Sequence, residues 1–264
     1  MKDEFETLKL TRDGDHILVL TLNRPEASNA MNTQMGLDLM HAFEQLQIEQ
    51  DGLRIVVVTG AGDKAFCAGG DLKQRRGMTD EQWMAQHAIF ERMLRALMSC
   101  PLPVMVAVNG AAYGGGCEFV AACDFVYASS NARFALTEVT LGIMPGAGGT
   151  QNLPRAMGTR RAMEVILTGL PFTAEQGEAW GLINKVTAPD KLMEEALTTA
   201  RRIAANAPIS VRQAKQSVLR GHQMSIWDGL AYEIEAYNRM VPTEDRREGV
   251  LAYNEKRKPN FRGR

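Results

Sequence analysis

The stretch Val104–Glu118, VMVAVNGAAYGGGCE, contains the sequence signals that decide the fold. Its first five residues are apolar without alternation, which is typical of a strand buried on both faces in a parallel sheet. Three consecutive glycines then end a turn, and the apolar helical segment CEFVAACDF follows. Strands that alternate with helices in this way indicate an α/β layer fold.

The flanking sequence repeats this alternation. His16–Leu22 and Arg54–Thr59 are short β-branched runs, which predict two more strands. Asn32–Gln50 and Thr79–Ser99 carry apolar residues at a spacing of three to four, which predicts amphipathic helices. Together these segments predict an α/β core.

The character of the sequence changes after about Thr187. From Pro189 to Tyr253 the pattern predicts successive helices and no strand, with breaks near Pro208, Gly221 and Pro242. We therefore expect an α/β core over residues 1–188 and a helical assembly region over residues 189–264.

Composition narrows the class of protein. The chain has 264 residues, of which 45% are hydrophobic and 23% charged, and this composition excludes a disordered, collagen-like or disulfide-scaffold protein. Thirty Lys and Arg against 31 Asp and Glu give a net charge of −1, so no overall attraction to nucleic acid or a membrane is expected. The start, MKDEFETLKL, lacks the apolar segment of a signal peptide, and no apolar run approaches the ~20 residues of a membrane span. We expect a cytoplasmic enzyme without a metal, because the four His are not at ligand spacing and the four Cys form no CxxC pair.

Glycines and carboxylates occur together in three stretches, Lys64–Lys73, Asn109–Glu118 and Leu136–Thr150. A glycine-rich turn that opens a helix presents unpaired backbone N–H groups, which can stabilise a phosphate or the oxyanion of an enolate. The second stretch does not fit GxGxxG, and the chain has no GxxxxGK[ST], so nucleotide phosphate is the weaker alternative.

Two glutamates in these stretches are candidates for acid–base chemistry. Glu118 lies in the first turn of the helix after the glycines, and Glu138 lies between apolar residues of the third stretch. A glutamate at such a position can simply face solvent or complement the helix dipole. Apolar neighbours favour partial burial, which would raise the pKa and suit each carboxyl for proton transfer.

The three stretches, in this order, resemble the crotonase (enoyl-CoA hydratase/isomerase) superfamily, as do Asn23–Ala27 (NRPEA) and Pro145–Gln151 (PGAGGTQ). The resemblance extends from about Leu22 to Arg257. It implies a crotonase-like spiral of ββα units followed by a C-terminal helical trimerisation region, with a homotrimer or homohexamer as the assembly.

The resemblance also assigns roles to residues. It implies that Glu118 and Glu138 are catalytic and that the N–H groups of Ala68 and Gly115 form an oxyanion hole. The substrate-binding residues that it implies are Ala68, Gly69, Gly70, Asp71 and Gly115, together with Tyr253 and Lys256, which would reach the CoA of a neighbouring subunit.

The implied reaction is addition of water to a 2-enoyl-CoA to give a 3-hydroxyacyl-CoA, with CoA as part of the substrate and no cofactor. Both glutamates are present, which favours hydration, whereas a double-bond isomerase needs one base. The segments Gly70–Arg75 (GDLKQR) and Val241–Arg257 are most similar to the AU-binding, methylglutaconyl-CoA hydratase branch, which would place the enzyme in leucine degradation. Gly70 stands where alanine is usual, and we expect Gln74–Phe90 to line the acyl end of the site.

RNA binding is an alternative function that this branch raises. Its RNA-binding member uses lysines on an early helix, but Asn32–Gln50 contains no Lys or Arg. Because contacts to phosphates dominate affinity for nucleic acid, this acidic segment argues against RNA binding.

Overall fold

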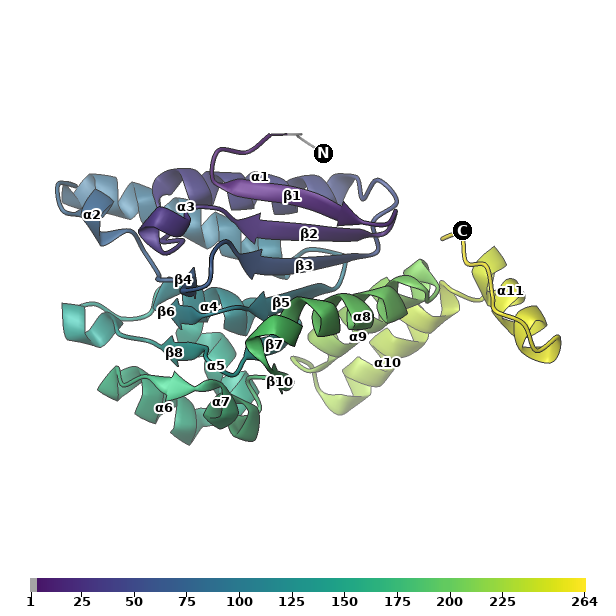
Figure 1. Cartoon of the computed structure of the whole chain (residues 1–264). Coiled ribbons are helices and arrows are strands. Elements are labelled where there is room, and N and C mark those ends of the chain that lie inside the picture. Colours follow the sequence, from purple (N-terminus) through teal and green to yellow (C-terminus); the bar gives the residue numbers. More distant parts are fainter. Residues whose placement is uncertain (1–3) are drawn as a thin grey trace.

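The computed structural model describes residues 4–264, so residues 1–3 of the expected core lie outside the described part. The larger of its two sheets has six strands in the order β1-β2-β3-β5-β7-β10, in which only the β1–β2 pair is antiparallel (Figure 1). The strands are β1 (Leu8–Asp13), β2 (Ile17–Leu22), β3 (Ile55–Gly60), β5 (Val104–Val108), β7 (Phe125–Ser129) and β10 (Lys185–Thr187).

A smaller sheet of four short strands has the order β4-β6-β8-β9. Its members are β4 (Ala65–Cys67), β6 (Ala111–Tyr113), β8 (Arg133–Ala135) and β9 (Phe172–Thr173). The strands β4, β6 and β8 run parallel to one another. Their carboxyl ends therefore meet at one edge of the sheet.

The two sheets are connected by a repeating ββα unit. In each repeat one strand enters the large sheet (β3, β5, β7), the next enters the small sheet (β4, β6, β8), and a helix follows. This confirms the expected spiral of ββα units. The helices before residue 188 are α1 (Thr33–Ile48), α2 (Leu72–Arg75), α3 (Asp80–Met98), α4 (Gly115–Ala122), α5 (Gly149–Met157), α6 (Thr159–Thr168) and α7 (Ala174–Trp180).

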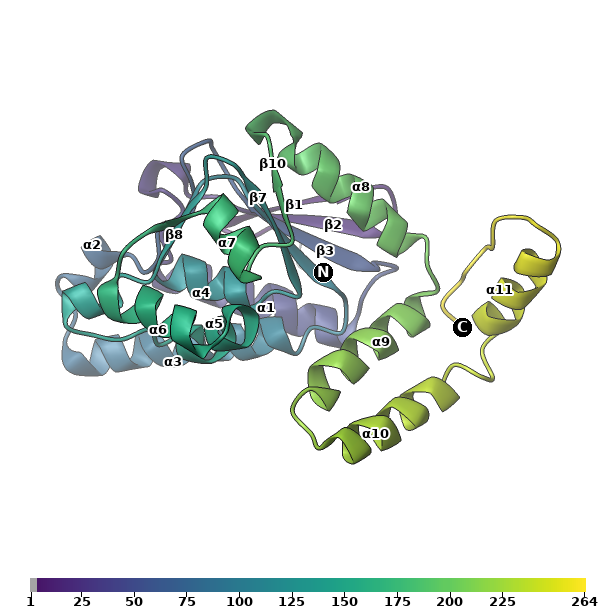
Figure 2. The same cartoon turned by 90° about the horizontal axis from the view of Figure 1, so that it is seen from below.

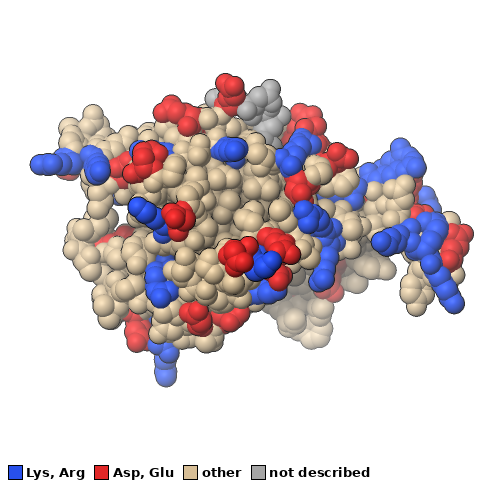
Figure 3. All heavy atoms as spheres, in the orientation of Figure 1, with Lys and Arg blue, Asp and Glu red and all other residues tan. Residues whose placement is uncertain are grey.

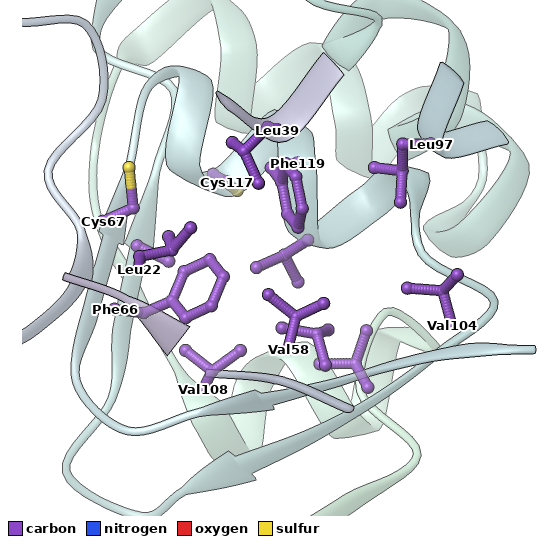
Figure 4. Close-up of a cluster of buried hydrophobic side chains, with 14 of the residues drawn as sticks. Leu22, Leu39, Val58, Phe66, Cys67, Leu97, Val104, Val108, Cys117 and Phe119 are labelled. Carbon is purple, nitrogen blue, oxygen red and sulfur yellow. The ribbon is translucent and has the colours of Figure 1, made fainter. Parts of the chain in front are cut away.

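Successive side chains of the large sheet point to opposite faces, and each face carries an apolar layer. Leu20, Val58 and Val106 belong to the main core with the buried faces of α1 and α3. Phe66 and Phe119 approach each other in this core with ring centroids 6.1 Å apart (Figure 4). The side chains that alternate with Leu20, Val58 and Val106 along the strands point to the opposite face of the sheet. Among them, Val57 and Met105 pack against α8 (Leu192–Ala204). The central strands are thus buried on both sides, as their uninterrupted apolar runs predict.

Four helices form the C-terminal part, as expected, with breaks that fall close to the predicted ones. They are α8, α9 (Pro208–Gly221), α10 (Ile226–Asn238) and α11 (Glu244–Asn254). Helix α8 lies against the sheet, whereas α9, α10 and α11 extend away from it (Figure 2). The division of the chain at residue 188 into a core and an assembly region stays a prediction.

Helix α9 is joined to the core by a buried cation. The Lys215 ammonium lies 2.6 Å from the Asp124 carboxylate and donates to the Leu102 carbonyl at 2.7 Å. Asp124 also accepts the N–H of Val104 at 2.6 Å, so its carboxylate connects α9 to the start of β5.

Candidate active site

The three glycine- and carboxylate-bearing stretches converge at the edge where β4, β6 and β8 end. Ala68–Asp71 follows β4, Gly114 and Gly115 follow β6, and Glu138 follows β8. Gly115 N lies 3.4 Å from the position that a Cβ would occupy on Gly69. The parallel register of three neighbouring strands therefore brings together segments that are far apart in the sequence.

The Glu118 side chain, at the start of α4, is fixed by hydrogen bonds from two backbone N–H groups. It projects from the first turn, the residue is 3% exposed, and Oε1 accepts N–H groups of Ala147 and Gly149, both at 2.8 Å. Burial raises its pKa to about 7; the N–H of Gly149 opposes this rise and the nearby Glu138 carboxyl adds to it. Glu118 can therefore gain or lose a proton near neutral pH.

Glu138 faces the same space with an unsatisfied carboxyl oxygen. Its Oε1 lies 3.2 Å from the position of a Cβ on Gly114, and its buried Oε2 has no hydrogen-bond partner among residues 4–264. Burial raises the pKa of Glu138 as well. An unpaired buried carboxyl oxygen is costly, and a bound molecule that donates a hydrogen bond would remove this cost.

Gly114 lets Glu138 come this close to the backbone. Its φ of 51° and ψ of −127° place it where side chains are rarely tolerated, and the chain there turns directly into α4. The N–H of Gly115, the first residue of α4, donates to no group of the described chain.

The structure corrects one predicted donor of the oxyanion hole. The Ala68 N–H already donates to the Ser28 carbonyl at 3.0 Å and is therefore engaged within the fold. Gly69 has a φ of 93°, so the backbone turns there and the N–H of Gly70 does not follow the direction of the Ala68 N–H. Met31 forms a parallel bridge with Gly70, donating to the Gly69 carbonyl at 2.7 Å and accepting from Asp71 N–H at 2.9 Å.

This bridge leaves the Gly70 N–H without an acceptor in residues 4–264. Gly70 N lies 4.0 Å from the position of a Cβ on Gly115, so the two free donors adjoin each other. Gly70 and Gly115 therefore present two adjacent N–H groups without acceptors, whereas the sequence analysis named Ala68 and Gly115.

Asp71 orders the loop rather than presenting a free carboxylate. It caps α2 by accepting from Lys73 N–H at 3.1 Å and Gln74 N–H at 3.2 Å, and it pairs with Arg24 at 3.0 Å. Burial opposes ionisation, but the Gln74 N–H and the Arg24 guanidinium outweigh it and lower the pKa of Asp71. Its role as a direct substrate contact stays a prediction.

The two C-terminal residues lie apart from this site. Tyr253 is 84% exposed on α11, and Lys256 follows that helix, on the part of the chain that extends farthest from β4 and β6 (Figure 1). Any contact of theirs with CoA would have to be made in a neighbouring subunit, so this assignment stays a prediction.

No group of three or more His, Cys, Asp or Glu side chains in residues 4–264 is arranged to hold a metal ion. None of the helices in the described chain is long and apolar enough to cross a membrane.

The chain is similar over nearly its whole length to proteins named as hydratases of CoA thioesters. Residues 12–264 match the sequence model of a family described as Enoyl-CoA hydratase/isomerase. A short-chain-enoyl-CoA hydratase of Clostridium acetobutylicum is 39% identical over 255 residues, which cover 97% of this chain and 97% of that protein. An (E)-benzylidenesuccinyl-CoA hydratase of Thauera aromatica is 39% identical over 249 residues, which cover 94% of this chain and 96% of that protein.

The fold agrees with a solved structure from the same group. The 1.8 Å crystal structure of an enoyl-CoA hydratase from Bacillus anthracis superposes with a TM-score of 0.96 at 40% identity, covering 98% of this chain and 100% of that one.

Proposed function

The chain belongs to the enoyl-CoA hydratase/isomerase family, and from this premise we propose that it adds water across the 2,3 double bond of a 2-enoyl-CoA thioester to give a 3-hydroxyacyl-CoA. The observation that carries the proposal is a pair of buried carboxyls beside two unpaired backbone N–H groups. No metal or redox cofactor is part of the proposal, because water and the thioester supply all atoms of the product.

The N–H groups of Gly70 and Gly115 would bind the thioester oxygen. A 2-enoyl thioester is a poor electrophile at C3 until negative charge can develop on that oxygen. Fixed donors stabilise this charge, and removal of one donor from such a site costs about 3–4 kcal/mol of barrier.

The two glutamates would divide the proton transfers. Glu118, with Oε1 fixed by two N–H groups, would hold a water molecule beside C3 and accept its proton. Glu138, with its unpaired Oε2, would deliver a proton to C2. One carboxyl must be ionised and the other protonated, and the Glu138 carboxyl raises the pKa of Glu118, which favours such a state.

Isomerisation of an enoyl-CoA double bond is the second candidate reaction, because one base could move a proton between C2 and C4. The buried pair favours hydration, since a second carboxyl positions the water. A side reaction of this kind would depend on Glu138 alone.

Substrate branch and assembly complete the proposal. The methylglutaconyl-CoA branch, and with it leucine degradation in the cytoplasm, is supported by the resemblance of the α2 and α11 segments.

Assembly as a homotrimer or homohexamer is supported by exposed apolar side chains on α9, α10 and α11: Val218, Leu219, Ile226, Trp227, Leu230, Ile234, Tyr237, Val250 and Leu251. RNA binding is not favoured, because α1 carries no Lys or Arg that could contact phosphates. On the face of the molecule shown in Figure 3, acidic and basic side chains are interspersed.

The test is the loss of enoyl-thioester absorbance with crotonyl-CoA and 3-methylglutaconyl-CoA, side by side, for the wild type and Glu138→Gln. We expect hydration by the wild type and a decrease of about 10²–10⁴-fold in the variant, because it lacks the proton donor. Affinity for a saturated acyl-CoA should remain. Near-normal turnover by Glu138→Gln would show that the mechanism is wrong, and wild-type inactivity on both thioesters would leave isomerisation as the better hypothesis.

A further inference from the structure

A guanidinium group lies beside the proposed oxyanion hole without a carboxylate partner. Arg75, the last residue of α2, places Nη1 3.1 Å and Nη2 3.5 Å from the position that a Cβ would take on Gly70. It forms no ion pair with any residue in 4–264, in contrast to Arg24, which pairs with Asp71 in the same loop.

The side chain is fixed in this place by neighbours on α3. Its Nε donates to the Gln86 Oε1 at 2.8 Å, and its guanidinium stacks over the Trp83 ring at 4.4 Å from the centroid. Gln86 is itself 2% exposed and donates through Nε2 to Thr33 at 2.9 Å and to Gln74 at 2.8 Å. A network of this kind holds a planar cation in one orientation before any ligand arrives.

The bonds that Arg75 makes leave its outer nitrogens free. Only Nε is engaged, so the N–H groups of Nη1 and Nη2 have no acceptor in the described chain. Partial burial lowers the pKa of Arg75, with no neighbouring carboxylate to offset the loss of water. Two parallel N–H donors of this kind match the two oxygens of a carboxylate.

Glycine at position 70 leaves room for the guanidinium to lie against the backbone. A methyl group there would come within 3.1 Å of Nη1 and 3.2 Å of Cζ, closer than side-chain carbons normally approach. The missing side chain at Gly70 and the unpaired guanidinium therefore lie in direct contact, beside the N–H that would bind the thioester oxygen.

We propose that Arg75 is a specificity-determining residue that binds a carboxylate at the far end of the acyl chain, so that the preferred substrates are 2-enoyl-CoA thioesters of dicarboxylic acids. This inference rests on the proposed function for the position of the thioester at Gly70 and Gly115. It adds the residue that would recognise the carboxylate of such an acyl group, which 3-methylglutaconyl-CoA also carries.

The alternative anion is a phosphate of CoA itself. The pantetheine arm separates the phosphates of CoA from the thioester, whereas Arg75 contacts Gly70, whose N–H would bind the thioester oxygen. Trp83 and Phe90 flank the guanidinium at 4.4 and 5.7 Å, and such rings suit the carbon chain of an acyl group better than a hydrated phosphate.

The experiment measures binding without turnover. Glutaryl-CoA and butyryl-CoA are saturated, cannot be hydrated, and differ mainly by one terminal carboxylate. Their dissociation constants would be measured by calorimetry for the wild type, Arg75→Met, Arg75→Lys and the control Arg76→Met, which alters an exposed neighbour. Hydration of glutaconyl-CoA and crotonyl-CoA by the same proteins gives the catalytic counterpart.

We expect Arg75→Met to weaken glutaryl-CoA by about 10- to 100-fold and butyryl-CoA by less than about 3-fold, because one charge-assisted interaction is lost. Arg75→Lys should fall in between, and Arg76→Met should resemble the wild type. Equal weakening of both ligands would assign Arg75 to the CoA phosphates and overturn the inference, as would no change in either.

The two proposals can fail separately. Absence of hydration with a preserved preference for glutaryl-CoA would refute the reaction but not the carboxylate site. Hydration of crotonyl-CoA with no effect of Arg75→Met on glutaconyl-CoA would refute only the carboxylate site.

Discussion

Replacing Glu118 by glutamine should separate catalysis from stability. The glutamine keeps the shape of the side chain and an oxygen that can accept the N–H groups of Ala147 and Gly149. It removes the carboxyl group, whose pKa burial raises to about 7. We therefore expect a variant that is nearly inactive in hydration and more stable than the wild type in alkaline solution.

The magnitude follows from the two pKa values of Glu118. The ordinary pKa is 4.5 and the folded one about 7, a difference of roughly 2.5 units, and each unit corresponds to about 1.4 kcal/mol, which gives about 3 kcal/mol. Below pH 4.5 the carboxyl is protonated in both the folded and the unfolded state, so the variant has no stability advantage over the wild type there. Between pH 4.5 and 7 the folded state binds more protons than the unfolded state, so wild-type stability falls as pH rises and then reaches a plateau.

Urea unfolding of both proteins at several pH values between 4.5 and 8.5 would measure this difference. The free energy of unfolding of Glu118→Gln minus that of the wild type should increase by about 3 kcal/mol across the range. Glu6→Gln, at an exposed glutamate, is the control and should give no such increase. Parallel curves for Glu118→Gln and the wild type would refute the argument that burial holds a proton on Glu118.

Two other substitutions test the packing around the site and around α9. In Gly149→Ala the new methyl would come within 2.9 Å of Glu118 Oε1 and 3.1 Å of Pro145 Cβ, so kcat should fall by at least about 10-fold through displacement of the carboxyl. Gly77→Ala, with no neighbour within 4 Å, should not change kcat, and equal effects of the two would contradict this reasoning. Lys215→Met removes the ion-pair partner of Asp124; the two side chains are 9% and 18% exposed, respectively. Because the Asp124 carboxylate would be left without its cation, the free energy of unfolding measured in urea should fall by about 2–3 kcal/mol. A loss below about 0.5 kcal/mol would mean that this pair behaves as a surface ion pair.

The long elements of the fold could be predicted because their patterns are local. The strands over Ile17–Leu22 and Val104–Val108 and the helices α1 and α3 agree with the sequence prediction to within about two residues, since burial imposes a regular spacing on each of them. Strand β6 was not predicted, because Ala111–Tyr113 lies in a glycine-rich segment where pairing with β4 and β8, and not propensity, determines the structure.

The site could be predicted in part, for a similar reason. Glu118 lies in the first turn of its helix and is buried, as its apolar neighbours indicated. The oxyanion donor was misplaced at Ala68 because N–H direction depends on which partner the extended segment pairs with, and that partner, Met31, is distant in sequence. The proposed role of Arg75 could not be predicted from the sequence. It depends on the contact of the guanidinium with Gly70 and on the hydrogen bond to Gln86, which only the folded structure shows.

The bridge between Met31 and Gly70 divides the site into two ends with different freedom to change. Strand pairing at this bridge and the turn into α4 fix the donors of Gly70 and Gly115, so the end that would activate the thioester is part of the sheet architecture. The groups that we propose for recognition of the acyl chain come from α2 and α3, whose side chains can be exchanged without altering any backbone bond of that bridge. A fold built in this way can acquire a new acyl preference by substitutions on one helical face, while its reacting end stays as it is.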